Sequence, residues 1–304
     1  MRPRNRAGLP DEKPGADAVP GGNAILTGMT AGVERAKVLI TVKAAPEPSS
    51  TYGDTVCVAG IRIDGDRAEW IRLYPFPFRW MPERVRFKKY DVIEVDVHRS
   101  ARDDRRESYR PDIQSIEIIS HLDKWKHRHE IVGRVTSTST CELHRAATIN
   151  SRAASLGLVP VGSVEKLEIL PFAGWSDAQL KRIADAENLA PLDLFGDGVN
   201  TPPELQAPRF TVRYRYRCSA SGCPSHGGQL LDWELGELQR RHLMNLPEDD
   251  AKREIEKKFL TQKFAPNRQT SFFVGNFGDK VKRGSFSVLG IYAPTLADAV
   301  PALF

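Results

Sequence analysis

The chain has 304 residues and a formal net charge of +5, with 40% hydrophobic and 27% charged residues. These proportions are typical of a soluble globular protein and exclude a fibrous or fully disordered chain. No apolar run approaches the roughly 18 residues of a membrane-spanning helix, and the opening residues lack the apolar stretch of a secretory signal. The four cysteines are better suited to a reducing, cytoplasmic location than to a disulfide framework.

Residues 1–34 are rich in proline, glycine and charge without apolar periodicity, which predicts a disordered tail. Short β-type runs bounded by turn residues follow, and their spacing predicts a small antiparallel barrel over residues 35–121. An OB-like five-stranded barrel is the most economical form, with an SH3-like barrel as an alternative. The predicted strands are residues 37–42, 55–61, 69–74, 91–98 and 113–120.

Residues 122–304 predict a helical connector and a second β-rich unit, so that the whole chain is expected to be a β-rich α+β protein. The pattern is helical over residues 122–155, and the Pro/Gly/Asp-rich residues 189–208 predict a linker or long loop. The remaining predicted elements are strands 163–170 and 209–217, helices 232–244 and 248–264, and a hairpin of residues 271–274 and 285–292.

A compact cluster of metal-ligand residues, Cys218, Cys223 and His226, follows strand 209–217. Thiolate and imidazole groups this close together on a glycine-bearing turn can bind one tetrahedral ion, so the cluster predicts a small structural zinc knuckle. A metal-free loop and a catalytic zinc are the alternatives. The candidates for the fourth ligand are His242, Cys57, Cys141, Asp232 and a water molecule.

Strand 209–217 alternates arginine with tyrosine. In an extended strand, Arg213, Arg215 and Arg217 share one face, and Tyr214 and Tyr216 share the other. We expect the arginines to bind phosphate and a tyrosine to stack on a base, which predicts binding of single-stranded DNA or RNA. The tyrosine face can equally belong to the core.

Aromatic and basic residues also alternate near the third strand of the predicted barrel. Arg72, Arg79 and Trp80 are predicted to extend the nucleic-acid-binding surface along the barrel rim. Each of these side chains could instead belong to the barrel core.

The acidic pair Asp232 and Glu234 precedes a predicted helix. Asp232 occupies the place of an N-cap and Glu234 lies in the first turn, where negative charge is favourable. The alternative is a metal-dependent nuclease or hydrolase centred on His226, Asp232 and Glu234. No Walker loop, dinucleotide fingerprint or nucleophile elbow is present in the sequence, and a non-enzymatic protein is expected.

Three short motifs in the predicted barrel, VCVAGI at 56–61, WIR at 70–72 and YDVIEV at 90–95, occur in this order. In these motifs the chain resembles the dual OB-fold accessory proteins of prokaryotic conflict and anti-phage systems, although that family's proline is displaced here by two residues to Pro75. The resemblance implies a nucleic-acid-binding accessory or sensor of bacterial defence. A protein-interaction subunit that docks a partner from the same operon through its β edges is a further alternative.

Overall fold

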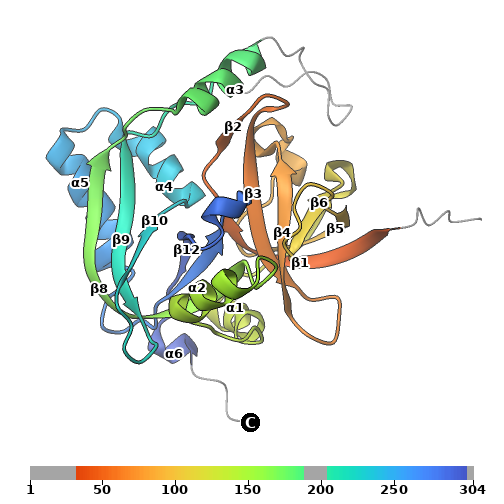
Figure 1. Cartoon of the computed structure of the whole chain (residues 1–304). Coiled ribbons are helices and arrows are strands. Elements are labelled where there is room, and N and C mark those ends of the chain that lie inside the picture. Colours follow the sequence, from red (N-terminus) through yellow and green to blue (C-terminus); the bar gives the residue numbers. More distant parts are fainter. Residues whose placement is uncertain (1–31, 188–203, 300–304) are drawn as a thin grey trace, which may run out of the picture. The chain divides into compact units, whose positions relative to one another are not determined.

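The computed structural model describes residues 32–187 and 204–299. Most of the predicted tail therefore lies outside the described residues, but Val33 and Glu34 already belong to the first strand. The described part is a mixed α+β structure dominated by strands, as predicted (Figure 1).

A closed five-stranded barrel forms the first half of the fold, and it confirms the predicted barrel. Its strands follow the circular order β1-β3-β4-β6-β5, and the pairing of β5 with β1 closes the ring. All neighbours are antiparallel except β4 and β6, which are parallel. This is the strand order of an OB fold. The bounds are β1 Val33–Lys43, β3 Gly53–Arg62, β4 Glu69–Phe76, β5 Asp91–Arg99 and β6 Ser108–Pro111.

Two short strands extend this sheet outside the ring. β2 (Glu47–Ser49) pairs with β3, and β7 (Glu117–His121) pairs with β5. The predicted strand 113–120 was therefore wrong in its first half. There Asp112 caps a 3₁₀ turn, Ile113–Ser115, by accepting a hydrogen bond from the backbone N–H of Gln114, and the fifth barrel strand is β6 before it.

The second half contains a five-stranded antiparallel sheet with the order β10-β9-β8-β11-β12. A parallel bridge between Leu230 and Val288 joins its two edges, because Leu230 continues β10 and Val288 lies in β12. When the five strands are numbered in chain order, their circular order is 1-2-3-5-4, which is also the circular order of the first barrel. The bounds are β8 Leu156–Pro171, β9 Phe210–Cys218, β10 His226–Gln229, β11 Ser271–Asn276 and β12 Phe286–Tyr292.

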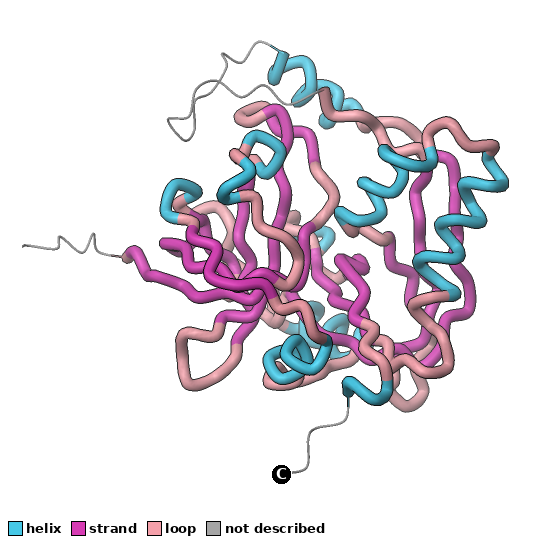
Figure 2. Tube along the Cα trace, turned by 180° about the vertical axis from the view of Figure 1, so that it is seen from behind, coloured by secondary structure: helices cyan, strands magenta, loops and turns pink. Residues whose placement is uncertain are grey.

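The helices lie between and beside these strands (Figures 1 and 2). A capping box of Ser139 and Glu142 starts α2, and π-helical turns continue α4 and α5. The helix α3 and the first half of the 16-residue strand β8 were not predicted. Residues 189–203 of the predicted linker lie outside the described residues. The helices are α1 Trp125–Val132, α2 Thr140–Ile149, α3 Asp177–Glu187, α4 Trp233–Leu238, α5 Glu248–Glu256 and α6 Leu296–Ala299.

In both units the connection between the third and fourth strands leaves the sheet. In the first barrel this connection, residues 77–90, carries two 3₁₀ turns, Phe78–Trp80 and Glu83–Val85. In the second unit it is longer and carries α4 and α5. These two connections are equivalent in topology, and both contribute to the cleft described below.

The outer face of β3 and β4 is covered by the second unit. Ala59 and Ile61 share one buried apolar cluster with Leu158 and Phe273, and the ring of Trp70 packs edge-on against Phe273. In many OB folds this face of the second and third strands binds the ligand. Here this face of β3 and β4 is buried against the second unit.

A buried polar joint accompanies this apolar contact. Arg72 of β4 donates to the carbonyl oxygen of Ser155 at 3.0 Å, and Glu107 accepts hydrogen bonds from the backbone N–H and hydroxyl of Ser155, both at 3.0 Å. Arg105 donates to the carbonyl oxygen of Asn276 at 2.7 Å. All five residues are buried, so these bonds are shielded from competing water.

Candidate metal centre and nucleic-acid interface

Four metal-ligand side chains meet beside β9. The Sγ atoms of Cys141, Cys218 and Cys223 and a ring nitrogen of His226 all lie within 4.8 Å of one another. Cys218 Sγ is 3.4 Å from Cys223 Sγ and 3.7 Å from Cys141 Sγ, and Cys141 Sγ is 3.3 Å from His226 Nε2. Ligand atoms at these separations can surround a single ion, so this Cys₃His cluster could hold a metal.

The local fold explains how these side chains converge. Cys218 ends β9 and His226 begins β10, and Gly222 and Ser225 adopt positive φ angles of 68° and 88° in the tight loop between them. Cys141 lies in the first turn of α2. Burial and the neighbouring thiols raise the pKa of Cys141 to about 12. The Cys141 thiol is therefore protonated near neutral pH unless a cation binds beside it.

The structure selects one of the five candidates for the fourth ligand. Cys141 completes the cluster, although it precedes Cys218 by more than 70 residues. Cys57 instead lies 3.5 Å from an Arg72 nitrogen, and Asp232 caps α4. His242 lies in the π turn that continues α4.

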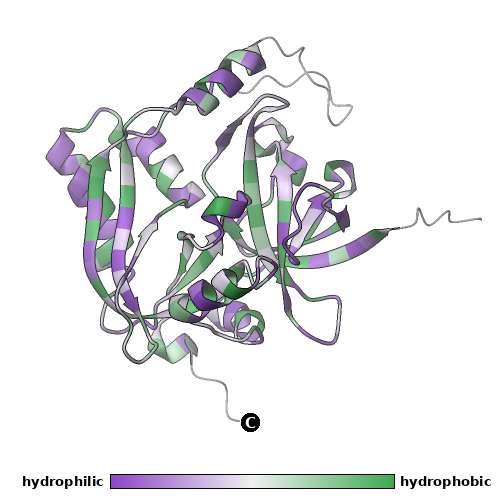
Figure 3. Cartoon of the chain, in the orientation of Figure 1, coloured by the Kyte–Doolittle hydropathy of each residue, from purple (hydrophilic) through white to green (hydrophobic). Residues whose placement is uncertain are grey.

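The alternation predicted for β9 is present. Arg213, Arg215 and Arg217 are exposed while the residues between them are buried, and the banding of β9 in Figure 3 follows this pattern. Arg215 pairs with Glu168 at 2.9 Å and Arg217 with Glu165 at 2.8 Å, both from β8 (Leu156–Pro171). The positive charge of the arginine face is thus partly neutralised by the adjacent strand.

The stacking role predicted for Tyr214 and Tyr216 is wrong. Their exposed fractions are 0% and 1%, and both rings pack against Phe272 in the core. The hydroxyl of Tyr214 donates to the carbonyl oxygen of Phe259, and the hydroxyl of Tyr216 lies 2.8 Å from Thr140 Oγ1. A nucleic-acid base cannot reach either ring because helices cover that side of the sheet.

The predicted rim residues are separated in the structure. Arg72 is buried in the joint between the two units and cannot bind an external phosphate, so its predicted role was wrong. Trp80 is half-buried against Gly53. Arg79 lines the cleft described below and donates to Asp54 at 2.9 Å, where burial raises the pKa of Asp54 to about 6 against the opposing effect of Arg79.

The structure does not bring the alternative catalytic residues together. His226 points into the Cys₃His cluster, whereas Asp232 caps α4 by accepting a hydrogen bond from the backbone N–H of Glu234 at 2.7 Å. The cluster with Cys141 is the single group of three or more close metal-ligand side chains among the described residues. Neither acid belongs to it.

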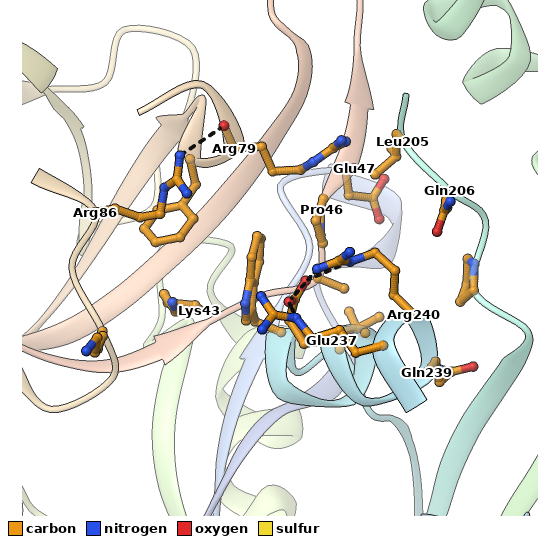
Figure 4. Close-up of a pocket in the computed structure, with 18 of the residues that line it drawn as sticks. Lys43, Pro46, Glu47, Arg79, Arg86, Leu205, Gln206, Glu237, Gln239 and Arg240 are labelled. Atoms are coloured by element: carbon orange, nitrogen blue, oxygen red, sulfur yellow. Dashed lines mark hydrogen bonds and ion pairs between the residues drawn. The ribbon is translucent and has the colours of Figure 1, made fainter. Parts of the chain in front are cut away.

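A cleft of about 970 Å³ lies between the first barrel and α4. Figure 4 shows Arg79 and Arg86 on the barrel side, with Glu237, Gln239 and Arg240 on the α4 side. Both signs of charge are present, together with aromatic rings. The aromatic residues are Phe78, Phe87, Phe172, Trp175 and Trp233. The basic ones are Lys43, Arg79, Arg86, Lys88, Arg240 and Arg241, and the acidic ones are Glu47, Glu83, Asp91, Asp123, Glu204 and Glu237.

Lys43 links the aromatic and charged parts of this cleft. Its Nζ lies 4.3 Å from the centre of the Phe78 ring and 5.1 Å from that of Trp233, distances typical of cation–π contacts. Burial lowers the pKa of Lys43 to about 8. The amine can therefore change its charge near neutral pH.

The positive charge of several guanidinium groups in the cleft is not fully neutralised by carboxylates. Arg86 donates to the carbonyl oxygens of Met81 and Arg79, and no carboxylate partner occurs for it in the part of the chain that the structure describes. Arg240 and Arg241 share the single carboxylate of Glu237, at 2.8 and 2.7 Å. The sequence signal for this cleft was the aromatic and basic run around Phe78, which sequence reasoning assigned to the barrel rim.

Comparisons with known proteins give little functional information. No curated protein matches the sequence. The chain is similar to a chain in a structure of a Replication Protein A heterotrimer bound to ssDNA, with 13% identity and a TM-score of 0.32 over 81% of this chain. It spans less than half of that protein's length, since 45% of the other chain is covered, and a likeness of this size identifies no ligand. In the described residues no helix has the length and apolarity to cross a membrane.

Two family profiles match the sequence, and both are described as domains of unknown function. One, DUF8758, matches residues 34–134. The other, DUF8757, matches residues 136–303, which is more than half of the chain. The chain therefore belongs to the DUF8757 family.

Proposed function

We propose that this protein binds single-stranded nucleic acid, and that the strand occupies the cleft between the first barrel and α4 (Trp233–Leu238). One observation carries the proposal: aromatic rings and guanidinium groups from both units line the same 970 Å³ space. Rings that stack on unpaired bases and cations that contact phosphates are the two components of single-strand binding sites.

The mixture of charges supports a ligand that carries bases. A plain polyanion would be repelled by carboxylates such as Glu47 and Glu237, whereas a nucleotide offers base N–H groups to them and phosphate to the arginines. The rings of Phe172 and Trp175 form an edge-to-face pair 5.1 Å apart on the cleft wall. Base pairs within a duplex would not expose their faces to such rings.

The arginine face of β9 supports a longer path for the strand. In OB folds the second and third strands carry the ligand, and β9 and β10 hold these places in the second unit. Gln229 of β10 lies opposite Arg213 in the strand register and also lines the cleft. We propose that the phosphates continue from the cleft onto Arg213, Arg215 and Arg217.

Two variants separate the surfaces. Arg86→Ala with Lys88→Ala removes two cations from the cleft, and Arg213→Ala with Arg215→Ala and Arg217→Ala removes three from β9. We expect the cleft variant to weaken binding of a labelled single strand at all sequences, by about tenfold or more, and to reduce the salt dependence of binding by about one unit of slope per lost contact. The β9 variant should have a smaller effect, because two of its arginines already pair with glutamates.

Fluorescence anisotropy with a single-stranded oligonucleotide and its duplex measures these effects at two salt concentrations. Unchanged affinity in the cleft variant, or equal affinity for single strand and duplex, would contradict the proposal. Loss confined to the β9 variant would move the site to the arginine face.

We also propose that the Cys₃His cluster holds zinc as a structural ion. Three thiolates and one imidazole form a closed tetrahedral set that leaves no position for a substrate. The role in bacterial defence that the resemblance of the barrel motifs implies remains a proposal as well. Its test is whether the cleft variant loses protection against phage in a host where the wild type provides it.

A further inference from the structure

One of the three cysteines in the Cys₃His cluster is open to the surface. A hollow of about 580 Å³ lies between the start of α2 (Thr140–Ile149) and the loop that joins β9 to β10. Cys141 and His226 line this hollow, whereas the buried Cys218 and Cys223 do not. A small reagent from solvent therefore reaches Cys141 ahead of the other two cysteines.

A second thiol lies directly beside Cys141. The Sγ of Cys141 is 3.7 Å from Cys218 Sγ, which is in turn 3.4 Å from Cys223 Sγ. Cysteines that are oxidised reversibly combine an accessible thiolate with a neighbouring thiol, which converts the first oxidation product into a disulfide. Cys141 has the place of the accessible thiolate and Cys218 that of the neighbour.

The metal ion that the cluster can hold would keep its sulfurs in the reactive form. A cysteine binds zinc as the thiolate, and the thiolate is also the nucleophilic form of the side chain. Cys57 lies outside the cluster, and its Sγ accepts a hydrogen bond from Arg72 Nη1 at 3.5 Å. Oxidation should therefore select the cluster over Cys57.

We propose that Cys141 is an oxidation site, at which hydrogen peroxide forms a disulfide with Cys218 and displaces the zinc ion of the proposed structural site. The Cys141 sulfur first attacks peroxide: an S–O bond forms, the O–O bond breaks, and the departing hydroxide takes a proton to become water. The Cys218 thiolate then attacks the Cys141 sulfur, so that the S–S bond forms and the sulfenic oxygen leaves as a second water. The two sulfurs lose two electrons, which reduce one molecule of peroxide.

The disulfide leaves only two ligands, Cys223 and His226, for the metal. Structural zinc sites use four protein ligands, so this pair should not retain the ion. The loop between β9 and β10 then loses one of its anchors. Arg217 is coupled to this loop, because its guanidinium donates to the carbonyl oxygen of Cys223 and pairs with Glu165 at 2.8 Å. Oxidation of the cluster therefore alters the support of the arginine face of β9.

Treatment of the purified full-length protein with hydrogen peroxide tests this site. A chromogenic chelator follows the released zinc, and peptide mapping without reductant locates the disulfide. We expect loss of about one equivalent of zinc for each disulfide, and a mass of the metal-free chain lower by two hydrogen atoms. The link should join Cys141 to Cys218, and its reduction in the presence of zinc should restore the bound ion.

Cys57→Ser is the matched control, because it removes a cysteine outside the cluster. It should release zinc and form the same link as the wild type. Cys141→Ser removes a proposed zinc ligand and can destabilise the cluster, so the decisive measurements are made on the wild type and on Cys57→Ser. Circular dichroism checks the fold of both proteins before oxidation.

Three results would overturn the proposal. One is zinc that stays bound at a peroxide exposure that fully oxidises free glutathione. The others are a disulfide between Cys218 and Cys223 and a disulfide that includes Cys57. The zinc content before treatment separates the two ideas. A zinc-loaded protein that resists peroxide removes the oxidation site alone, whereas a protein that holds no zinc and forms no disulfide refutes the structural ion as well.

Discussion

Cys141 Sγ lies 3.3 Å from His226 Nε2, so that a residue in the first turn of α2 (Thr140–Ile149) meets one at the start of β10 across 85 positions of sequence. An ion bound here would fasten α2 to the second sheet. The contact between Tyr216 and Thr140 reinforces the same connection.

Removal of the ion should therefore lower stability. We expect one equivalent of zinc in the purified protein, and a lower melting temperature after chelation or in Cys141→Ser, at roughly 2–4 °C for each kcal/mol lost. Elemental analysis and calorimetry measure both effects. Cys57→Ser, which changes a cysteine outside the cluster, is the control. A metal-free protein whose melting temperature is insensitive to chelator would refute the metal site.

Trp175 provides a test of base stacking in the cleft with little risk to the fold, because it is only partly buried. Trp175→Ala should weaken binding of a single strand by about 1–3 kcal/mol, the usual contribution of a stacked base. Quenching of tryptophan fluorescence on binding, reduced in the variant, would report the same contact. Trp70, which packs on Phe273 in the interface, should not be quenched. An unaltered affinity of Trp175→Ala would exclude stacking on this ring.

Binding should depend on pH through Lys43. With a pKa of about 8, its amine is charged at pH 7 and largely neutral at pH 9, so affinity for nucleic acid should fall across this interval. Lys43→Arg should retain its charge and flatten the profile, and Lys43→Met should be weak at both values. Anisotropy titrations from pH 7 to pH 9 measure the effect. A steep profile that persists in Lys43→Arg would assign the titration to another group.

The same lysine affects stability with the opposite sign. Between about 8 and its ordinary value of 10.5, the unfolded chain holds a proton on Lys43 that the folded protein has released. The contribution of Lys43 to the free energy of unfolding therefore rises with pH in this window. Denaturant melts of the wild type and Lys43→Met at pH 8 and pH 10 should differ in this direction.

Tyr216 should matter for the fold and not for the ligand. Tyr216→Phe removes its hydrogen bond to Thr140 and should cost about 0.5–1.5 kcal/mol of stability, more if the remaining hydroxyl is left without a partner. Its affinity for single-stranded nucleic acid should equal that of the wild type. Urea denaturation measures the stability, and fluorescence anisotropy measures the affinity. A loss of binding without a loss of stability would show that Tyr216 contacts the nucleic acid.

The sequence was sufficient to predict the first barrel, because its short alternating strands are separated by strong turn signals. It also predicted that Arg215 and Tyr216 lie on opposite faces of β9, because successive side chains of any strand point to opposite sides. It could not decide which face is buried. That depends on helix α5 and the π-helical turn that continues it, which pack on the tyrosine side through Ile255 and Phe259.

Contacts between distant segments were less predictable. Cys141 was one of five candidates for the fourth ligand, and nothing local distinguishes it from Cys57. The cleft depends on how the two units pack, so that Phe78 and Trp233 meet with their ring centres 5.1 Å apart although 155 residues separate them. The expectations for Arg72, Tyr214 and Tyr216 were wrong for the same reason. Each side chain has a polar or aromatic character suited to a surface, yet a neighbouring element covers it.

The joint at Ser155 has a consequence for dissecting the protein into fragments. The family profiles divide the chain between residues 134 and 136, which invites expression of each half alone. Such a cut would leave the carboxylate of Glu107 and the guanidinium of Arg72 without their partner in the other half. It would also expose apolar side chains such as Ile61 and Phe273 to water. We therefore expect neither half to be stable alone. If the chain is divided, both halves should be expressed together so that they can associate.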